Sequence, residues 1–162
     1  MILLDRSACR AYELFAAYPG SNGGWRAGSG AIFDLRRNEL RPPGWTSADA
    51  AGLSILAGLV RYEEVAAGRI DHAIRVTAPH TANRYVWPAR HAASDLAAPN
   101  LPPMGLRLRL KANVRIDDLP RQARIVAVAM KRYGVIVADN GSPWYISGAP
   151  NQRWDNDALH AL

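Results

Sequence analysis

The segment KRYGVIVADNGSPWYISG, residues 131–148, decides the fold more than any other part of the chain. Gly134 is the glycine expected just after a helix, and the apolar, β-branched run of residues 135–139 predicts a strand. Asn140-Gly141 is the preferred dipeptide of a two-residue type I′ turn. The sequence therefore predicts a β-hairpin that returns over residues 142–146. One end of it would carry four polar or aromatic side chains, Asp139, Asn140, Trp144 and Tyr145.

Alternation of apolar and polar residues predicts further strands. The segment IDHAIRVT, residues 70–77, places His72 on the same face as its isoleucines, and LRLRL, residues 106–110, alternates leucine with arginine. Less regular strands are expected over residues 1–4, 9–18, 31–35 and 84–87. Residues 88–103 are rich in Ala and Pro and predict a long loop, a feature that is often functional in a compact domain.

Helical spacing predicts two or three short helices. Residues 120–133 predict the longest, because Pro120 suits a first turn and an apolar stripe follows it. This helix is expected to bury Val126, Ala129, Met130 and Tyr133. Residues 59–67 predict a short helix closed by a glycine, and another is expected from Asp155. The pattern predicts a β-rich α+β fold in one globular domain, residues 1–162, with an antiparallel sheet, a sandwich and a closed barrel all open.

Composition is that of an ordinary globular protein, with 49% hydrophobic and 21% charged residues. No apolar run approaches the roughly 18 residues of a membrane span. The net charge is +6, from 20 Lys and Arg against 14 Asp and Glu, but the basic residues are scattered and form no tract typical of nucleic-acid binding. We therefore expect neither a nucleic acid nor a membrane as partner, and the oligomeric state stays open.

Several kinds of site are disfavoured by the sequence. Cys9 is the sole cysteine, which excludes an intramolecular disulfide and a cysteine-rich metal site. The histidines have no metal-binding spacing, and no nucleotide-binding or nucleophile-elbow motif is present. We expect no cofactor and no metal. The N-terminus, MILLDRSACRAYELF, lacks the basic start, apolar middle and cleavage site of a signal peptide.

Carboxylates and a histidine carry the predicted chemistry. Glycoside hydrolysis needs two carboxyl groups facing one cleft, one protonated and one ionised. Glu64 and Asp139 are the preferred pair, with His72 tuning one of them. Glu64 precedes the strand of His72 by a tight return, so we expect these two side chains to meet. Structural roles also stay open: Glu64 as a helix partner of Arg61, His72 as a satisfied core histidine, and Asp139 as a turn residue. Other carboxylates considered are Asp34, Asp49, Glu63 and Asp71.

Substrate contacts are predicted around these groups, because aromatic rings stack on sugar faces, although they also fill protein cores. The residues expected to bind substrate are Asn140, Trp144, Tyr145, Arg61 and His91. A further possibility is an acidic polymer bound by Arg107, Arg109 and Lys111, although such a stripe is commonly a solvated sheet face.

Four long segments resemble those of predicted secreted bacterial proteins of unassigned function that are often tied to carbohydrate-rich habitats. The segments are GWTSADAAGL (44–53), GLVRYEEVAAGRIDHAIRVT (58–77), PPMGLRLRLKA (102–112) and KRYGVIVADNGSPWYISG (131–148). The resemblance implies a location outside the cell and an association with polysaccharide, and it implies no catalytic residue. The sequence thus predicts a secreted carbohydrate-active enzyme that cleaves a polysaccharide or oligosaccharide by glycoside hydrolase-like acid/base chemistry. The alternative is a non-catalytic carbohydrate-binding or cell-surface module.

Overall fold

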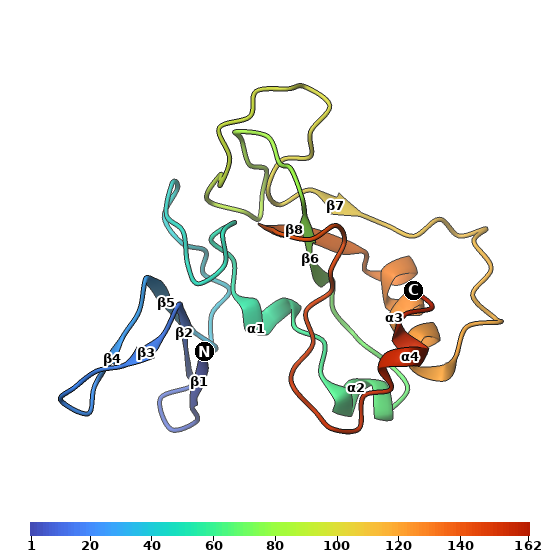
Figure 1. Cartoon of the computed structure of the whole chain (residues 1–162), viewed down its shortest axis with the longest axis horizontal. Helices are drawn as coiled ribbons and strands as arrows, with labels where there is room; N and C mark the ends of the chain where they lie inside the picture. Colours follow the sequence, from blue (N-terminus) through green and yellow to red (C-terminus); the bar gives the residue numbers. More distant parts are fainter.

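Three β-sheets and four short helices make up this computed structural model, which describes residues 1–162 (Figure 1). The first sheet has the order β1 (Ile2–Asp5), β2 (Arg10–Phe15), β5 (Ser29–Asp34), and the small second sheet pairs β3 (Tyr18–Pro19) with β4 (Trp25–Arg26). The third has the order β6 (Ile74–Ala78), β8 (Val135–Asn140), β7 (Arg107–Leu108). The helices are α1 (Ile55–Gly58), α2 (Tyr62–Ala66), α3 (Arg121–Arg132) and α4 (Asn156–Leu159). The predicted β-rich α+β class is confirmed, and no sheet closes into a barrel.

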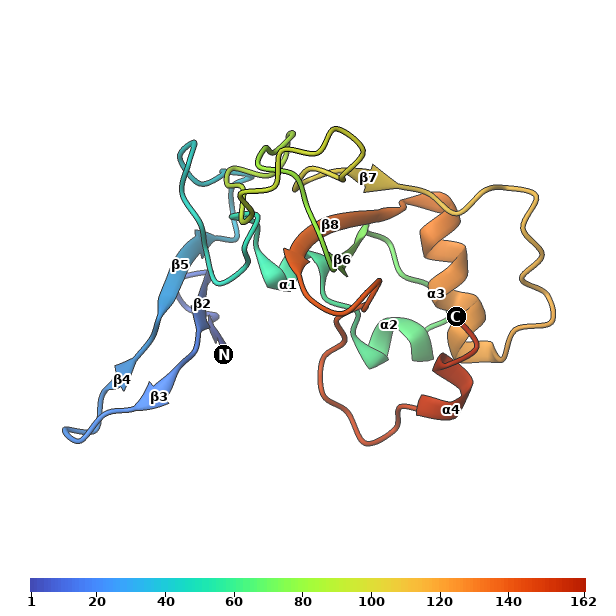
Figure 2. The ribbon, with the colours of Figure 1, turned by 45° about the horizontal axis from the view of Figure 1, so that its top comes forward.

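The first sheet extends from one end of the molecule (Figure 1, Figure 2). It contains the three strands predicted for residues 1–35. Glu13 in β2 is fully buried, and its carboxylate accepts hydrogen bonds from Ser54 Oγ at 2.7 Å and from the N–H groups of Ile55 and Leu56 at 2.7 and 3.0 Å. This buried acid thus caps α1 and ties the first sheet to the rest of the chain.

The third sheet is mixed, because β8 pairs in parallel with β6 and antiparallel with β7. The crossover from β6 to β8, residues 79–134, contains the long loop, β7 and α3. Residues 88–103 form no helix or strand, as predicted. This connection lets α3 lie on one face of the sheet, while the segments around α1 lie toward the other (Figure 2).

The hairpin predicted at Asn140-Gly141 is wrong, although the strand before it is present as β8. A type I′ turn needs positive φ at both central residues, and neither of these residues has it. Asn140 instead uses its side-chain amide to donate to Thr81 Oγ1 at 3.0 Å, which fits its place as the last residue of the strand. The chain then passes the end of β6 and returns along its other edge, where Ile146 bridges Val76.

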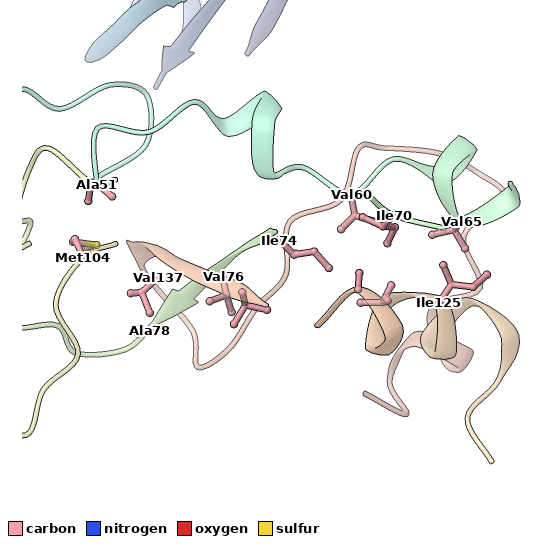
Figure 3. Packing of buried hydrophobic residues seen from close by; sticks show 14 residues of the cluster. Ala51, Val60, Val65, Ile70, Ile74, Val76, Ala78, Met104, Ile125 and Val137 are labelled. Atoms are coloured by element: carbon pink, nitrogen blue, oxygen red, sulfur yellow. The ribbon is translucent and has the colours of Figure 1, made fainter. Parts of the chain in front are cut away.

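Helix α3 covers the third sheet with an apolar layer (Figure 3). Pro120 is its N-cap and Gly134, with φ 81°, follows its C-cap, as the sequence predicts. The helix buries Ala123, Ile125, Val126, Ala127 and Ala129, and the sheet contributes Ile74, Val76, Val135 and Val137. Each buried valine or isoleucine contributes roughly 1.5–3 kcal/mol, so this interface is the main core. Of the side chains predicted to be buried, Val126 and Ala129 are, whereas Met130 and Tyr133 are partly buried at its edge.

Several predicted elements are shorter than the sequence pattern suggests. The strand expected over residues 70–77 begins only at Ile74, so His72 precedes it. The LRLRL segment pairs with β8 only at Arg107 and Leu108, because the partner strand starts just after Gly134. The strand expected over residues 84–87 is reduced to one bridge. Alternation of apolar and polar residues indicates a half-buried surface. A strand also needs a neighbouring strand of the same length with which to pair.

Candidate functional site

A buried arginine on the central part of β6 gathers two carboxylates and a hydroxyl. Arg75 donates from Nε and Nη2 to Asp49 Oδ2 at 3.0 and 2.8 Å. Its Nη2 also lies 3.6 Å from Asp139 Oδ2, and its Nη1 donates to Ser147 Oγ. A guanidinium is planar and always charged, so these contacts fix the positions of both acidic side chains.

A β-bulge in β8 turns Asp139 toward this arginine. The pairing of β6 with β8 is regular until Thr77, which pairs with Asp139 and leaves Ala138 as an extra residue. In a regular strand Asp139 would point into the core beneath α3, because side chains alternate between the two faces. The extra residue reverses the alternation, so Asp139 lies on the same face as Arg75. Ala51 N–H donates to Ala138 O at 2.9 Å and holds the bulge in place.

Asp49 is held by a loop with many internal hydrogen bonds, residues 46–53, and no helical turn forms there. Ser47 Oγ donates to Leu53 O at 2.6 Å and accepts from Asp49 N–H at 2.9 Å. Asp49 Oδ1 accepts from Ala51 N–H at 2.9 Å. Both carboxylate oxygens are therefore bonded inside the protein, and Asp49 is only 1% exposed.

Burial changes the acidity of both carboxyl groups. Burial above all, and also the nearby Asp139, raise the pKa of Asp49 from 3.8 to about 7 against the opposing effect of Arg75. Burial also raises the pKa of Asp139, although Arg75 and the N–H of Asn140 oppose this. The Asp139 side chain is still 34% exposed, so it is the carboxyl that a ligand can reach. An accessible acid with a raised pKa is typical of an acid/base site.

A cavity of about 220 Å³ lies beside Asp139, and His91 lines it too. The Nδ1 of His91 is 2.9 Å from Ala50 O, so the hydrogen of the neutral ring lies on Nδ1 and Nε2 is left as an acceptor. No other side-chain hydrogen bond involves His91. The cavity is thus lined by an accessible carboxyl and by an imidazole whose Nε2 has no hydrogen-bond partner.

The predicted contact between Glu64 and His72 is present. His72 Nε2 lies 3.2 Å from Glu64 Oε1, and both side chains are mostly buried. His72 Nδ1 is also 2.9 Å from Ala73 O. Glu64 accepts from the backbone N–H of Arg61 at 3.0 Å and from its guanidinium, which makes it part of the cap of α2. Arg61, expected to bind substrate, is therefore engaged with Glu64.

Glu64 does not line the cavity beside Asp139, so the structure does not bring the two predicted catalytic carboxylates together at that cavity. His72 precedes the first residue of β6, whereas Asp139 pairs with Thr77 near the end of that strand. His72 is five positions before Thr77 in the chain and lies outside β6. Glu64 and His72 are close in the sequence, and this proximity predicts their contact. It does not predict where along the sheet Asp139 of β8 lies.

Trp144 and Tyr145 lie exposed near the end of β6, at 54% and 67%. Trp144 N–H donates to Thr77 O, and Thr77 N–H donates to Tyr145 O, each at 3.0 Å. Because Thr77 also pairs with Asp139, the backbone of the aromatic pair lies two strand spacings, or about 10 Å, from the backbone of Asp139. The Trp144 side chain lines a cavity with Leu108 and Met130, on the sheet face that α3 covers. Trp144 adopts φ 62°, an unusual conformation for a bulky residue.

Asp49 and Arg75 are the residues that sequence reasoning missed as a pair. Asp49 was one carboxylate among several, and Arg75 fell on the face opposite the isoleucines. An arginine inside an otherwise apolar strand needs a buried acceptor, and the Ser47-x-Asp49 spacing is typical of a loop held by side-chain hydrogen bonds. The sequence thus indicates that Arg75 needs a buried acceptor and that Asp49 lies in an ordered loop, but it does not indicate that these two residues bind each other.

The structure contains no group of three or more His, Cys, Asp or Glu side chains arranged to hold a metal ion. None of its helices has the length and apolar character needed to cross a membrane. No protein-family model, curated protein or solved structure matches the chain. The site is therefore interpreted from its own geometry.

Proposed function

We propose that this protein is a carbohydrate-active enzyme that cleaves a polysaccharide by acid/base hydrolysis, with Asp139 and His91 as its catalytic residues. The observation that carries the proposal is the bulge at Ala138, which places Asp139 beside Arg75 and on the wall of a cavity. Bulges recur next to active sites because they redirect a side chain. A core strand has no structural need for a half-exposed acid at this position.

In the proposed reaction, protonated Asp139 donates its proton to the glycosidic oxygen as the bond to the anomeric carbon breaks. His91 Nε2 takes a proton from the water whose oxygen bonds to that carbon. Hydrolysis thus leaves an ionised Asp139 and a protonated His91, and a proton returns from His91 to Asp139 through solvent. Arg75 stabilises the ionised carboxylate, and Asp49 positions Arg75.

The spacing of the carboxyl groups supports catalysis. The nearest oxygens of Asp49 and Asp139 flank one nitrogen of Arg75 at 2.8 and 3.6 Å. Their separation therefore falls below the roughly 10 Å that we take as the limit for two carboxyls acting in one cleft. Asp49 is too buried to touch substrate, so its role is to hold Arg75 and to keep the proton affinity of the cluster high.

The aromatic pair supports a saccharide as substrate. Trp144 and Tyr145 are exposed and line one cavity together with Pro150 and Trp154, and ring faces of this kind stack on sugars. An extracellular location is part of the proposal, because four segments of the chain resemble predicted secreted bacterial proteins.

A screen for new reducing ends over plant, fungal and bacterial glycans tests the proposal. On a cleaved glycan, Asp139→Asn should lower the rate by about 10²–10⁴-fold, and His91→Gln should also lower it strongly. Glu64→Gln is the matched control, because it removes a half-buried carboxyl outside the cavity and should leave the rate unchanged in folded protein. Oxygen from isotope-labelled water should appear in the product. Cleavage without that label, or no cleavage of any glycan, contradicts hydrolysis.

A second function is favoured by the exposed aromatic pair alone, namely a non-catalytic carbohydrate-binding or cell-surface module. In that case Trp144 and Tyr145 would bind the glycan and Asp139 would at most accept hydrogen bonds from its hydroxyls. Binding of a glycan that the protein never cleaves, with the same affinity in wild type and Asp139→Asn, would favour this module over the enzyme.

A further inference from the structure

A second and larger cavity, of about 390 Å³, lies on the other side of Asp49. It is enclosed by the segment that follows β5, by the segment from Asp49 to Gly58, and by the face of the third sheet that carries Arg75. The first cavity, beside Asp139, also contains Asp49 in its wall, so the two cavities are neighbours. A volume of this size lies in the range of sites for small ligands, about 300–1,000 Å³.

The acidic groups that line this larger cavity already have partners. Asp34 accepts from the backbone and side chain of Arg36 at 3.0 and 3.2 Å. Glu39 accepts from Arg37 Nη1 at 3.1 Å. Asp49 is bonded to Arg75 and to the backbone, as described above. None of these carboxylates is left without a cation or an N–H donor beside it, so the cavity has little need of a bound cation.

Arg107 is the arginine of this cavity that has no partner. It lies opposite Ile136 in the register of β7 with β8, and Ile136 lies opposite Arg75 in β6, so both arginines occupy the same sheet face. The structure contains no side-chain hydrogen bond or ion pair of Arg107, whereas Arg37 and Arg75 both have carboxylate partners. Its neighbour Arg109 is not free, because it donates to Lys131 O at 3.0 Å. Arg107 therefore presents a full guanidinium fork, which suits a planar carboxylate.

We infer that the larger cavity binds the carboxylate of an acidic sugar through Arg107, so that the polysaccharide is a polyuronate. The inference that the ligand is a saccharide rests on the proposed function, since the cavity adjoins the proposed acid/base site at Asp49. The preference for a carboxylate rests separately on the unpaired Arg107. The net charge of +6 adds a general attraction for a polyanion.

Binding of uronate trisaccharides to the Asp139→Asn variant tests the inference, because that variant should bind without cleaving. The probes are the trimers of galacturonate, glucuronate and mannuronate and the methyl ester of each, which keeps the sugar skeleton and removes the charge. At least one acid should bind about tenfold or more tightly than its ester, as a charge-assisted hydrogen bond implies, and Arg107→Gln should remove that difference. Arg124→Gln is the matched control, because it removes an unpaired exposed arginine from α3, on the opposite face of the sheet, and should leave the difference intact.

Three results overturn the inference, two of them from the acid and ester pairs and one from a sulfated probe. One is equal binding of every acid and its ester, and the other is a preference for the acid that survives Arg107→Gln. A sulfated neutral trisaccharide that binds as tightly as the best uronate would also overturn the assignment of a carboxylate. These outcomes are independent of the cleavage screen, since the binding experiment requires no turnover. Failure of the hydrolysis proposal therefore leaves the acid preference measurable, and loss of the acid preference leaves the cleavage result intact.

Discussion

Asp49 and Asp139 share one nitrogen atom of Arg75, since Nη2 lies 2.8 Å from Asp49 Oδ2 and 3.6 Å from Asp139 Oδ2. Two ionised carboxylates around one guanidinium would leave an excess negative charge in a largely buried place. Burial disfavours the ionised form of each carboxyl and raises the pKa of both, and the nearby Asp139 adds to this effect for Asp49. The same arrangement should stabilise the folded protein and support the proposed acid/base chemistry, and the free energy of unfolding and the cleavage rate measure these two effects.

Removing the arginine should be strongly destabilising. Arg75→Gln would leave Asp49 and Asp139 close together without a compensating charge, and breaking a buried pair in this way costs about 3–5 kcal/mol of unfolding free energy. Urea unfolding measures the change. Arg124→Gln, an exposed arginine on α3, should stay within about 0.5 kcal/mol of wild type. Similar unfolding midpoints for the two variants would show that the cluster does not hold the fold.

The free energy of unfolding should depend on pH through Asp49. Its pKa is about 7 in the folded protein against 3.8 when unfolded, so the folded state binds the proton more tightly between these values. The stabilisation is complete below pH about 4 and is lost as the pH rises through about 7. Asp49→Asn cannot titrate and should show a flatter profile over this window, measured by urea unfolding at each pH. An unchanged slope in Asp49→Asn would contradict the assignment.

The bulge can be tested by removing its extra residue. Deleting Ala138 would remove the bulge but leave Asp139 opposite Thr77, on the face of Arg75, because Asp139 would then directly follow Val137. Cleavage activity should therefore persist in the folded variant, while stability should fall by about 1–3 kcal/mol because the acceptor of Ala51 N–H is lost. Ala138→Gly keeps the residue count and should cost only about 0.5–1 kcal/mol of stability while preserving activity. Thermal unfolding and the reducing-end assay measure the two effects. Lost activity in a folded deletion variant would show that the site needs the bulge itself and not only the direction of Asp139.

Glu13 should decide how firmly the first sheet is attached. Glu13→Ala would leave Ser54 and two N–H groups of α1 without their acceptor, at a cost of about 1–3 kcal/mol. Hydrogen exchange should then rise in β2 and β5, with little change in α3. Glu39→Ala, which removes an exposed carboxylate paired with Arg37, serves as control and should leave the exchange rates unaltered.

Substitution of Trp144 should change protein stability and glycan binding in different directions. Its φ of 62° costs a bulky residue roughly 1 kcal/mol, so Trp144→Gly should keep or raise the melting temperature. The same change should weaken glycan binding, because the exposed ring is lost. Trp87→Gly removes another exposed ring away from this segment and should not alter affinity. Equal glycan affinity in wild type and Trp144→Gly would exclude the aromatic pair as a sugar platform.

Local signals in the sequence predicted local structure well. The strand at residues 135–139, the helix at residues 120–133 and the contact of Glu64 with His72 all depend on neighbours in the chain, and all are present. The Asn140-Gly141 turn does not form, although this dipeptide is a strong hairpin signal. Asn140 binds Thr81 instead, and the following chain pairs with the edge of β6 at Val76.

The candidate site was only partly predictable. Asp139 and His91 were both named from the sequence, but Asp49 and Arg75 were not joined, since 26 positions separate them and no period links a loop acid to a strand arginine. The direction of Asp139 depends on one unpaired residue, Ala138. Strand alternation assumes regular pairing, so a bulge is invisible until the partner strand is known.

The parallel pairing of β6 with β8 also bears on how the protein folds. These neighbours are joined by the whole crossover of residues 79–134, so their contacts close a long loop and form only after its entropy has been overcome. Arg75 lies on one of these strands and Asp139 on the other, while the strands of the first sheet pair with neighbours that are closer in sequence. The charged cluster is therefore expected to assemble late in refolding, and its formation would mark the last step to the native state.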